Sequence, residues 1–362
     1  MASKMRLTAL FAVLVAAFLL GPRQFGLATA SEQTTATVAS INFPIEGWTV
    51  VAQAKGFFKE EFDKLGTEVK LVDPGTMQLV GAEAAMLDRG GLAVAQRMIY
   101  PATVQKANGI DASIVWLSGQ SSPARTPVLA LKSSSAETVA DLDGKNFGSS
   151  RVSCGWSSPT EIFDKAGVPL DTKNDQGRVR FTNISNPVAG NAALLSGRID
   201  ATATHVALPD VAALLKTGEV KTIGNSPDDG VYVNAAGRVA YFVMREFVQQ
   251  HPEHIRSFLR VRERTVAWIN ANVDEAAKIV ARDTRVPVDI ARFGIEDASE
   301  FQYMKGEPSA SVAVNAIETF QAWYIDHGDD ILKSRHLTNE QIEAFVDRRF
   351  FSGGEYSIYG NN

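Results

Sequence analysis

Residues 147–161 read FGSSRVSCGWSSPTE, a pattern that predicts a short strand, a loop of small residues and then a helix. Pro159 is a residue type that suits the first turn of a helix. Free backbone N–H groups at a helix N-terminus favour an anion, so the serine-rich loop is a candidate anion site. The alternative is an ordinary capped helix, with Ser157 or Ser158 as N-cap and Glu161 in the first turn.

Residues 1–30 have the pattern of an export signal. Lys4 and Arg6 precede an apolar run over residues 7–20, and residues 28–30 form a small-residue cleavage signature. The run is shorter than the roughly 20 apolar residues that a membrane-spanning helix needs. We therefore expect an exported protein in the periplasm, with no membrane anchor.

Charge and cysteine content narrow the classes of function. The 362-residue chain has a formal net charge of −5, and loss of Lys4, Arg6 and Arg23 with the leader would make it −8. This acidity argues against nucleic acid as a partner, because phosphate-backbone binders carry a basic patch. Local donors can still bind a small anion. Cys154 is the only cysteine, so no intramolecular disulfide can form.

Strands and helices alternate along the chain, which predicts an α/β fold with mainly parallel sheets flanked by helices. Two loops rich in Ser, Pro and Gly, residues 119–125 and 225–230, bracket the middle of the chain, and we interpret them as two crossings of a hinge. Lobe one is then residues 36–125 and 233–362, with a helical C-terminal extension, and lobe two is residues 126–232. In such sheets ligands bind beyond the carboxyl ends of the strands.

The expected elements can be compared with a structure. Strands are expected at residues 35–41, 68–72, 92–95, 113–117, 126–131, 146–149, 178–184, 199–204, 220–223 and 238–244. Helices are expected at 48–65 with a break at Gly56, and at 77–88, 99–107, 138–142, 157–166, 188–195, 209–215, 254–270, 273–281, 312–325 and 338–345. Thr338 and Gln341 have the spacing of a capping box.

Five phrases occur in order over roughly residues 40–279: AKGFFKEEFDKLGTEVKLVD, TVADLDGKNFGSS, EIFDKAGVPLD, AALLSGRIDATATHVALPD and HPEHIRSFLRVRERTVAWINANVDEAAKIV. Taken together they resemble the periplasmic solute-binding proteins of ABC importers for aliphatic sulfonates, taurine and nitrate. The resemblance implies a two-lobed type II periplasmic-binding-protein fold. Such a receptor closes on one small ligand and delivers it to a membrane permease.

Members of that family bind their ligand through loops that follow the strands, with hydroxyls, backbone N–H groups and often a basic or amide side chain around an oxyanion. In this chain the residues implied are Asn42, Trp48, Thr76, Ser121, Ser122, Arg151, Ser153, Trp156, Ser157, Asn186 and His205. Arg151 also fits a solvated surface arginine, His205 a hydrogen-bonded structural histidine, and the tryptophans core packing. Glu46 departs from the pattern, because a carboxylate repels an anion unless it points away or is paired. A neutral or cationic solute therefore remains an alternative.

The same fold is used by a sulfinate-cleaving desulfinase and by a pyrimidine synthase. Cys154 lies beside the predicted helix N-terminus and near Arg151, surroundings that would lower a thiol pKa and make the sulfur nucleophilic. However, the desulfinase cysteine follows the first strand, where this chain has Phe43 and Pro44, and the cysteine cluster of the synthase is absent. We expect a monomeric receptor for a small anion, with no catalytic residue, metal or cofactor. A ligand-sensing receptor domain is a third class.

Overall fold

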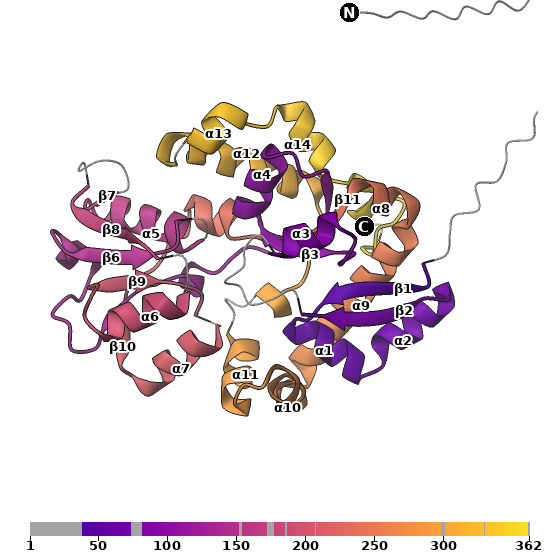
Figure 1. Ribbon diagram of the computed structural model, residues 1–362, viewed down its shortest axis with the longest axis horizontal. Helices are drawn as coiled ribbons and strands as arrows, with labels where there is room; N and C mark the ends of the chain where they lie inside the picture. Colours follow the sequence, from indigo (N-terminus) through magenta and orange to yellow (C-terminus); the bar gives the residue numbers. More distant parts are fainter. Residues whose placement is uncertain are drawn as a thin grey trace, which may run out of the picture. The chain divides into compact units, whose positions relative to one another are not determined.

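The computed structural model describes residues 38–73, 82–151, 154–171, 177–184, 187–206, 208–297, 301–328 and 330–360 (Figure 1). The strands are β1 (Ser40–Pro44), β2 (Glu68–Val72), β3 (Ala95–Met98), β4 (Ala112–Leu117), β5 (Val128–Leu131), β6 (Asn146–Ser149), β7 (Leu170–Asp171), β8 (Val179–Asn183), β9 (Ala201–Ala203), β10 (Val220–Gly224) and β11 (Val239–Met244).

The α-helices are α1 (Gly47–Ala54), α2 (Phe57–Phe62), α3 (Ala82–Asp88), α4 (Ile99–Ala107), α5 (Cys154–Lys165), α6 (Pro187–Leu195), α7 (Pro209–Thr217), α8 (Arg245–Gln250), α9 (Pro252–Ala271), α10 (Val273–Thr284), α11 (Val288–Glu296), α12 (Ala310–His327), α13 (Asp330–Arg335) and α14 (Asn339–Phe345). Short helical turns are η1 (Asp63–Leu65), η2 (Pro123–Arg125), η3 (Val139–Leu142), η4 (Tyr232–Ala236), η5 (Phe301–Tyr303) and η6 (Arg348–Phe350). In the described ranges no helix is long and apolar enough to cross a membrane.

A six-stranded sheet is built only from the middle of the chain, in the order β10-β5-β9-β6-β8-β7. Strands β9, β6, β8 and β7 are parallel to one another, while β5 is antiparallel to both β9 and β10. Figure 1 shows α5 on one face of this sheet and α6 and α7 on the other. Successive residues of β6 point to opposite faces of the sheet. Phe147 packs on Phe163 of α5, whereas Gly148 faces Ile184 and Ile199.

The rest of the chain contributes a parallel pair, β1 and β2, and a three-stranded sheet in the order β3-β11-β4. Ala93 N–H donates to Asn42 O at 2.9 Å, which joins the parallel pair to the segment before β3. Strand β11 is antiparallel to both of its neighbours. The parallel direction therefore holds for strands joined by helical connections, including β10, which follows β9 through α7. The strands that run against their neighbours are β5 and β11, which follow the predicted crossings.

Several expected elements are confirmed. Helix α4 has the predicted bounds, Gly56 separates α1 from α2 with φ of 73°, and Thr338 and Gln341 form the capping box. The expected strand at 35–41 instead reaches Pro44, because Phe43 is fully buried and pairs with Leu71 of β2. The strand expected at 92–95 is instead β3, which starts at Ala95 and pairs with β11.

The predicted caps of α5 are wrong. The helix begins at Cys154, so Ser157 and Ser158 lie within it and are not its N-cap. Pro159 is consequently an interior residue of the helix. The earlier start brings Cys154 and Trp156 into an apolar cluster with α4 and α12, and this burial outweighs the local preference for a serine cap.

Candidate functional site

The loops after β6 and β9 are neighbours because these two strands are adjacent and parallel. Ser149 Oγ at the end of β6 donates to Ala203 O at the end of β9, at 2.8 Å. Two residues from these loops, 51 positions apart in sequence, meet: Cys154 Sγ lies 2.8 Å from His205 Nε2. Both side chains are buried, so the contact is sheltered from water.

Burial decides the charge state of this pair. It raises the pKa of the Cys154 thiol to about 11, although the nearby Arg125 charge acts in the opposite direction. Burial, together with the Arg125 charge, holds the pKa of His205 well below its usual range. The pair is therefore a neutral thiol beside a neutral imidazole.

Arg125 comes from the first predicted hinge crossing and is only 2% exposed. Its Nη1 donates to Gly237 O and, at 3.3 Å, to Ser121 Oγ. Its guanidinium carbon lies 4.3 Å from the centre of the Phe301 ring. A buried arginine held on one nitrogen and stacked on a ring keeps its other nitrogen for a further partner.

Two hydroxyl groups next to the predicted crossings complete the surroundings of the Cys154 sulfur. Thr126 Oγ1 lies 2.7 Å from the Tyr232 hydroxyl, and both groups contact the Cys154 sulfur. We call the following set the Arg125 cluster: Ser121, Arg125, Thr126, Cys154, His205 and Tyr232. Ser121 and Arg125 lie in the first predicted crossing and Thr126 follows it directly, whereas Cys154 begins α5, His205 follows β9 and Tyr232 begins η4.

Four buried polar atoms, in the Arg125 cluster or on α5, have no hydrogen-bond partner among the described residues. They are Arg125 Nη2, His205 Nδ1, Ser157 Oγ and Trp156 Nε1. Buried polar groups in proteins are almost always paired, so such a set is unusual. Arginine, indole and hydroxyl groups can all donate, and this is the chemistry that holds an oxyanion.

One face of α5 binds both crossings. Ser158 Oγ donates to Thr126 O at 3.0 Å and lies 2.5 Å from Ser226 Oγ. The Glu161 carboxylate accepts from the backbone N–H groups of Val231 and, at 2.9 Å, of Tyr232. Together with Cys154 these residues have the i, i+4, i+7 spacing of one helix face, which we call the α5 stripe.

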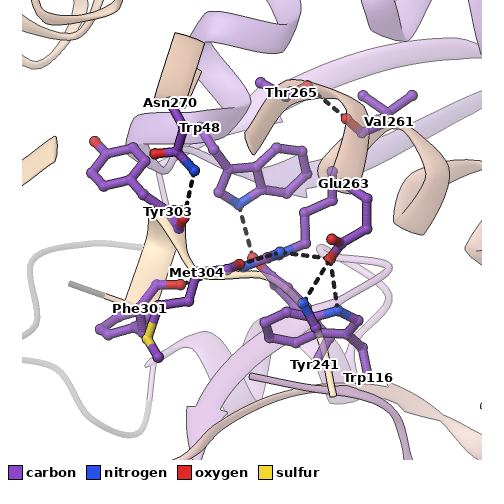
Figure 2. A network of polar contacts seen from close by, with 12 residues as sticks. Trp48, Trp116, Tyr241, Val261, Glu263, Thr265, Asn270, Phe301, Tyr303 and Met304 are labelled. Atoms are coloured by element: carbon purple, nitrogen blue, oxygen red, sulfur yellow. Dashed lines mark hydrogen bonds and ion pairs between the residues drawn. The ribbon is translucent and has the colours of Figure 1, made fainter. Parts of the chain in front are cut away.

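A second polar network lies at the start of α1, around the carboxylate of Glu46. Glu46 Oε2 accepts from the Trp48 indole N–H, from the Tyr241 hydroxyl at 2.7 Å and from the Gln96 amide at 3.3 Å. Figure 2 shows the Trp48 indole nitrogen directed at Tyr241, 2.8 Å from its hydroxyl. Neutral donors thus satisfy the carboxylate that departs from the anion-binding pattern.

The segment Phe301–Gly306 lies between these two networks. Arg262, fully buried against the Trp116 ring at 3.7 Å, donates to Met304 O and Phe301 O. Figure 2 shows Glu263 receiving the Trp116 indole N–H, and it also accepts from Gly306 N–H. Gln302 Oε1 in turn accepts from Gly47 N–H, at the N-terminus of α1, at 2.6 Å.

A family model described as NMT1/THI5 like matches residues 47–276 of the chain. The chain belongs to the NMT1/THI5-like family. A curated relative, the putative aliphatic sulfonates-binding protein of Bacillus subtilis (strain 168), is 25% identical over 232 residues, which is 64% of this chain and 64% of that protein. The match thus spans a little less than two thirds of the relative's length.

Solved structures show the fold of this NMT1/THI5-like chain. The periplasmic aliphatic sulphonate binding protein SsuA from Escherichia coli superposes with a TM-score of 0.64 at 18% identity, over 83% of this chain and 92% of that chain. The desulfurization enzyme DSZB gives a TM-score of 0.57 at 14% identity, over 88% of this chain and 97% of that chain. The fold is the two-lobed type II periplasmic-binding-protein fold.

The structure places some of the predicted ligand-binding residues in or beside the Arg125 cluster. Ser121 and His205 belong to it, and Ser157 lies on α5 with its hydroxyl unpartnered among the described residues. Trp156, 1% exposed, packs its ring against Tyr100, Trp323 and Tyr324, with centroids 5.4 to 6.0 Å apart. Ligand contact by these residues stays a prediction.

Other predicted residues lie elsewhere or have local partners. Asn42 Nδ2 donates to Gly91 O, Ser122 Oγ accepts from Ala124 N–H in η2, and Trp48 is fully buried. The Arg151 carbonyl accepts from the Tyr100 hydroxyl at 2.8 Å. Thr76, Ser153 and Asn186 lie outside the described residues. Their roles also stay predictions.

Sequence reasoning missed Arg125, Thr126 and Tyr232. The signal for Arg125 was an arginine at the end of a hinge loop directly before a buried strand, in an acidic chain. Thr126 and Tyr232 gave no such signal, because their contact joins positions 106 residues apart. Within the described part of the chain, no three His, Cys, Asp or Glu side chains are grouped to hold a metal ion.

Proposed function

We propose that this protein is an exported solute-binding receptor of an ABC importer, and that it captures a small sulfonate-like anion between its two lobes. The observation that carries the proposal is a pair of buried atoms in the Arg125 cluster, Arg125 Nη2 and His205 Nδ1, that have no hydrogen-bond partner among the described residues. The sulfonate-binding relatives support it, since they share the family or the fold. Contacts from both lobes then favour the closed state, which a permease would recognise.

The proposed lobes are residues 36–125 with 233–362, and residues 126–232. The six-stranded sheet, which uses only strands from residues 128–224, supports this division. The hinge would be formed by the two crossings that the α5 stripe binds. A monomer is proposed, and the mass of the purified protein in solution tests it.

Ligand screening tests the anion proposal. Thermal unfolding is followed with methanesulfonate, taurine, nitrate, sulfate, carboxylates and amines, and each hit is quantified by calorimetry. A ligand at a hundredfold excess over its dissociation constant stabilises the folded state by about 2.7 kcal/mol. We expect the largest shift from a sulfonate. A shift from amines alone would contradict the proposal.

Catalysis is the second candidate, because DSZB shares the fold. A cysteine nucleophile acts as the thiolate, and burial here raises the pKa of Cys154 to about 11. We therefore propose binding without turnover. Product analysis checks this: the ligand should be recovered unchanged after long incubation. Consumption of a ligand that stops in Cys154→Ser would establish an enzyme.

Export is proposed from the leader-like pattern of residues 1–30 and from the periplasmic location named for the similar E. coli protein. Expression of the full chain in a Gram-negative host, followed by fractionation and N-terminal sequencing, tests it. The protein should be recovered from the periplasm with Ser31 as its first residue. Cytoplasmic protein that keeps residues 1–30 would contradict export.

A further inference from the structure

The contact between Cys154 and His205 poses a question of proton position. Sulfur and Nε2 are 2.8 Å apart, and both groups are neutral because of their burial. A neutral imidazole carries one proton, on Nδ1 or on Nε2, and the contact to the sulfur determines which. The answer fixes whether the other nitrogen, Nδ1, offers a hydrogen or a lone pair.

The surroundings of the sulfur indicate the direction of the bond. The Thr126 side chain hydrogen-bonds the sulfur, and a threonine hydroxyl can be the donor in this bond. The thiol proton is then free to point at Nε2. An imidazole nitrogen is also a much stronger acceptor than a thiol sulfur.

We propose that the Cys154 thiol donates its proton to His205 Nε2, which fixes the tautomer whose Nδ1–H acts, with Arg125 Nη2, as a donor to the ligand's anionic group. This rests on the proposed function, and it names the chemistry of the same site. Cys154 is then a positioning residue that acts through His205. The structure supplies two unpartnered atoms: Nδ1 of His205, which is 7% exposed, and Nη2 of Arg125, which is 2% exposed.

The tautomer determines which ligands fit. With Nδ1 protonated, His205 Nδ1 and Arg125 Nη2 can each donate a hydrogen bond but cannot accept one. They therefore suit a ligand group that only accepts hydrogen bonds. A sulfonate is fully ionised and meets this condition. A phosphonate monoanion has the same charge but keeps one O–H group, which must find an acceptor. An oxyanion with a proton left on it therefore loses a hydrogen bond that a sulfonate does not need.

The tautomer can be observed directly. Protein with ¹⁵N-labelled histidine is examined by NMR, and the His205 signals are assigned by their loss in His205→Asn. We expect a protonated Nδ1 and a hydrogen-free Nε2 in the wild type and in Cys154→Ser, whose hydroxyl is also a donor. In Cys154→Ala we expect a shift toward the other tautomer. If the His205 imidazole of the wild type is protonated on Nε2, in the free or in the ligand-bound protein, the proposal is overturned.

Binding is measured by calorimetry with methanesulfonate and methylphosphonate at about pH 5, below the second pKa of a phospho group. We expect wild type to bind methanesulfonate at least about tenfold more tightly than methylphosphonate. Cys154→Ala should weaken methanesulfonate binding about tenfold, and Cys154→Ser should stay within about threefold of wild type. Circular dichroism confirms that each variant is folded.

The outcomes separate the two proposals. If the wild type binds methanesulfonate and Cys154→Ala binds it equally well, the positioning role is wrong and the anion receptor stands. Equal affinity of the wild type for the two ligands also overturns the donor-only site. If the wild type binds neither these anions nor any other in the screen, both proposals fail.

Discussion

Gly148 shows how closely the six-stranded sheet is packed under α6. A Cβ atom at this position would lie 2.8 Å from Ile184 Cδ1 and 2.8 Å from Ile199 Cδ1. Protein interiors are packed too densely to accept such contacts without a shift of the neighbours. Glycine at this position in β6 is therefore favoured by the limited space beside the two isoleucines, and its conformational freedom is not the reason.

We predict that Gly148→Ala lowers the free energy of unfolding by about 1–3 kcal/mol, the usual cost of overpacking. The matched control is Gly294→Ala in α11, where an added Cβ would have no atom within 4 Å. There alanine should raise the free energy by about 0.5–1 kcal/mol through its helix propensity. Urea unfolding of both variants measures this. A neutral Gly148→Ala would show that the isoleucines rearrange freely.

His205 makes stability depend on pH. Its pKa is held well below 6.5 by burial and the Arg125 charge, so in acid the unfolded chain takes up a proton that the folded chain does not. The neutral His205 side chain therefore contributes fully to the free energy of unfolding above about pH 6.5. As the pH falls below this value, the free energy of unfolding decreases by about 1.4 kcal/mol per pH unit. We predict that His205→Asn has a smaller slope between about pH 6 and pH 5. Equal slopes in urea titrations would refute this.

At the scale of an element, α5 joins the loop after β6 to both predicted crossings. Glu161 is the strongest part of this connection, because its carboxylate accepts two backbone N–H groups at the start of η4. Burial raises the pKa of this carboxyl group, so the ionised form is costly and depends on those donors. The α5 stripe thus joins α5 to the segments next to both predicted crossings.

We predict that Glu161→Gln lowers the free energy of unfolding by about 1–3 kcal/mol, since the amide NH₂ would face a backbone donor. Glu343→Gln on α14 is the control, because it removes only an exposed ion pair with Arg348 and should cost less than about 1 kcal/mol. Denaturant titration compares the two variants. Equal costs would mean that the contact of α5 with η4 adds little stability.

The elements differ in how far the sequence predicted them. Helix α4 and the capping box of α14 follow from local pattern and cap chemistry, and both are as expected. The start of α5 could not be predicted in this way, because serine preference is local while the burial of Trp156 against α12 is not. Strand β1 passes the expected break for the same reason, through the burial of Phe43.

At the scale of the whole molecule, the sequence indicated the fold and the loops that follow strands, and hence Ser121 and His205. It did not indicate Arg125 or the pairing of Cys154 with His205. These contacts depend on which strands become neighbours and on where the chain crosses back, as Thr126 and Tyr232 show. A single sequence carries no direct record of either.

Trp156 is placed to report the proposed movement of the lobes through its fluorescence. Of the tryptophans it alone lies in residues 126–232, yet its ring contacts Tyr100, Trp323 and Tyr324 from the other proposed lobe.

Ligand binding that moves the lobes should change the intrinsic emission, and Trp156→Phe should remove most of that change. Trp268→Phe should preserve it, because that ring lies under Lys55 and packs against an apolar cluster whose described members all lie outside residues 126–232. Because Trp323 packs on the same ring, it could also report the movement, so a signal that survives unchanged in both Trp156→Phe and Trp323→Phe would show that the lobes do not move apart at this place. If Trp156→Phe removes the signal as predicted, closure of the lobes can be followed in real time without any attached dye.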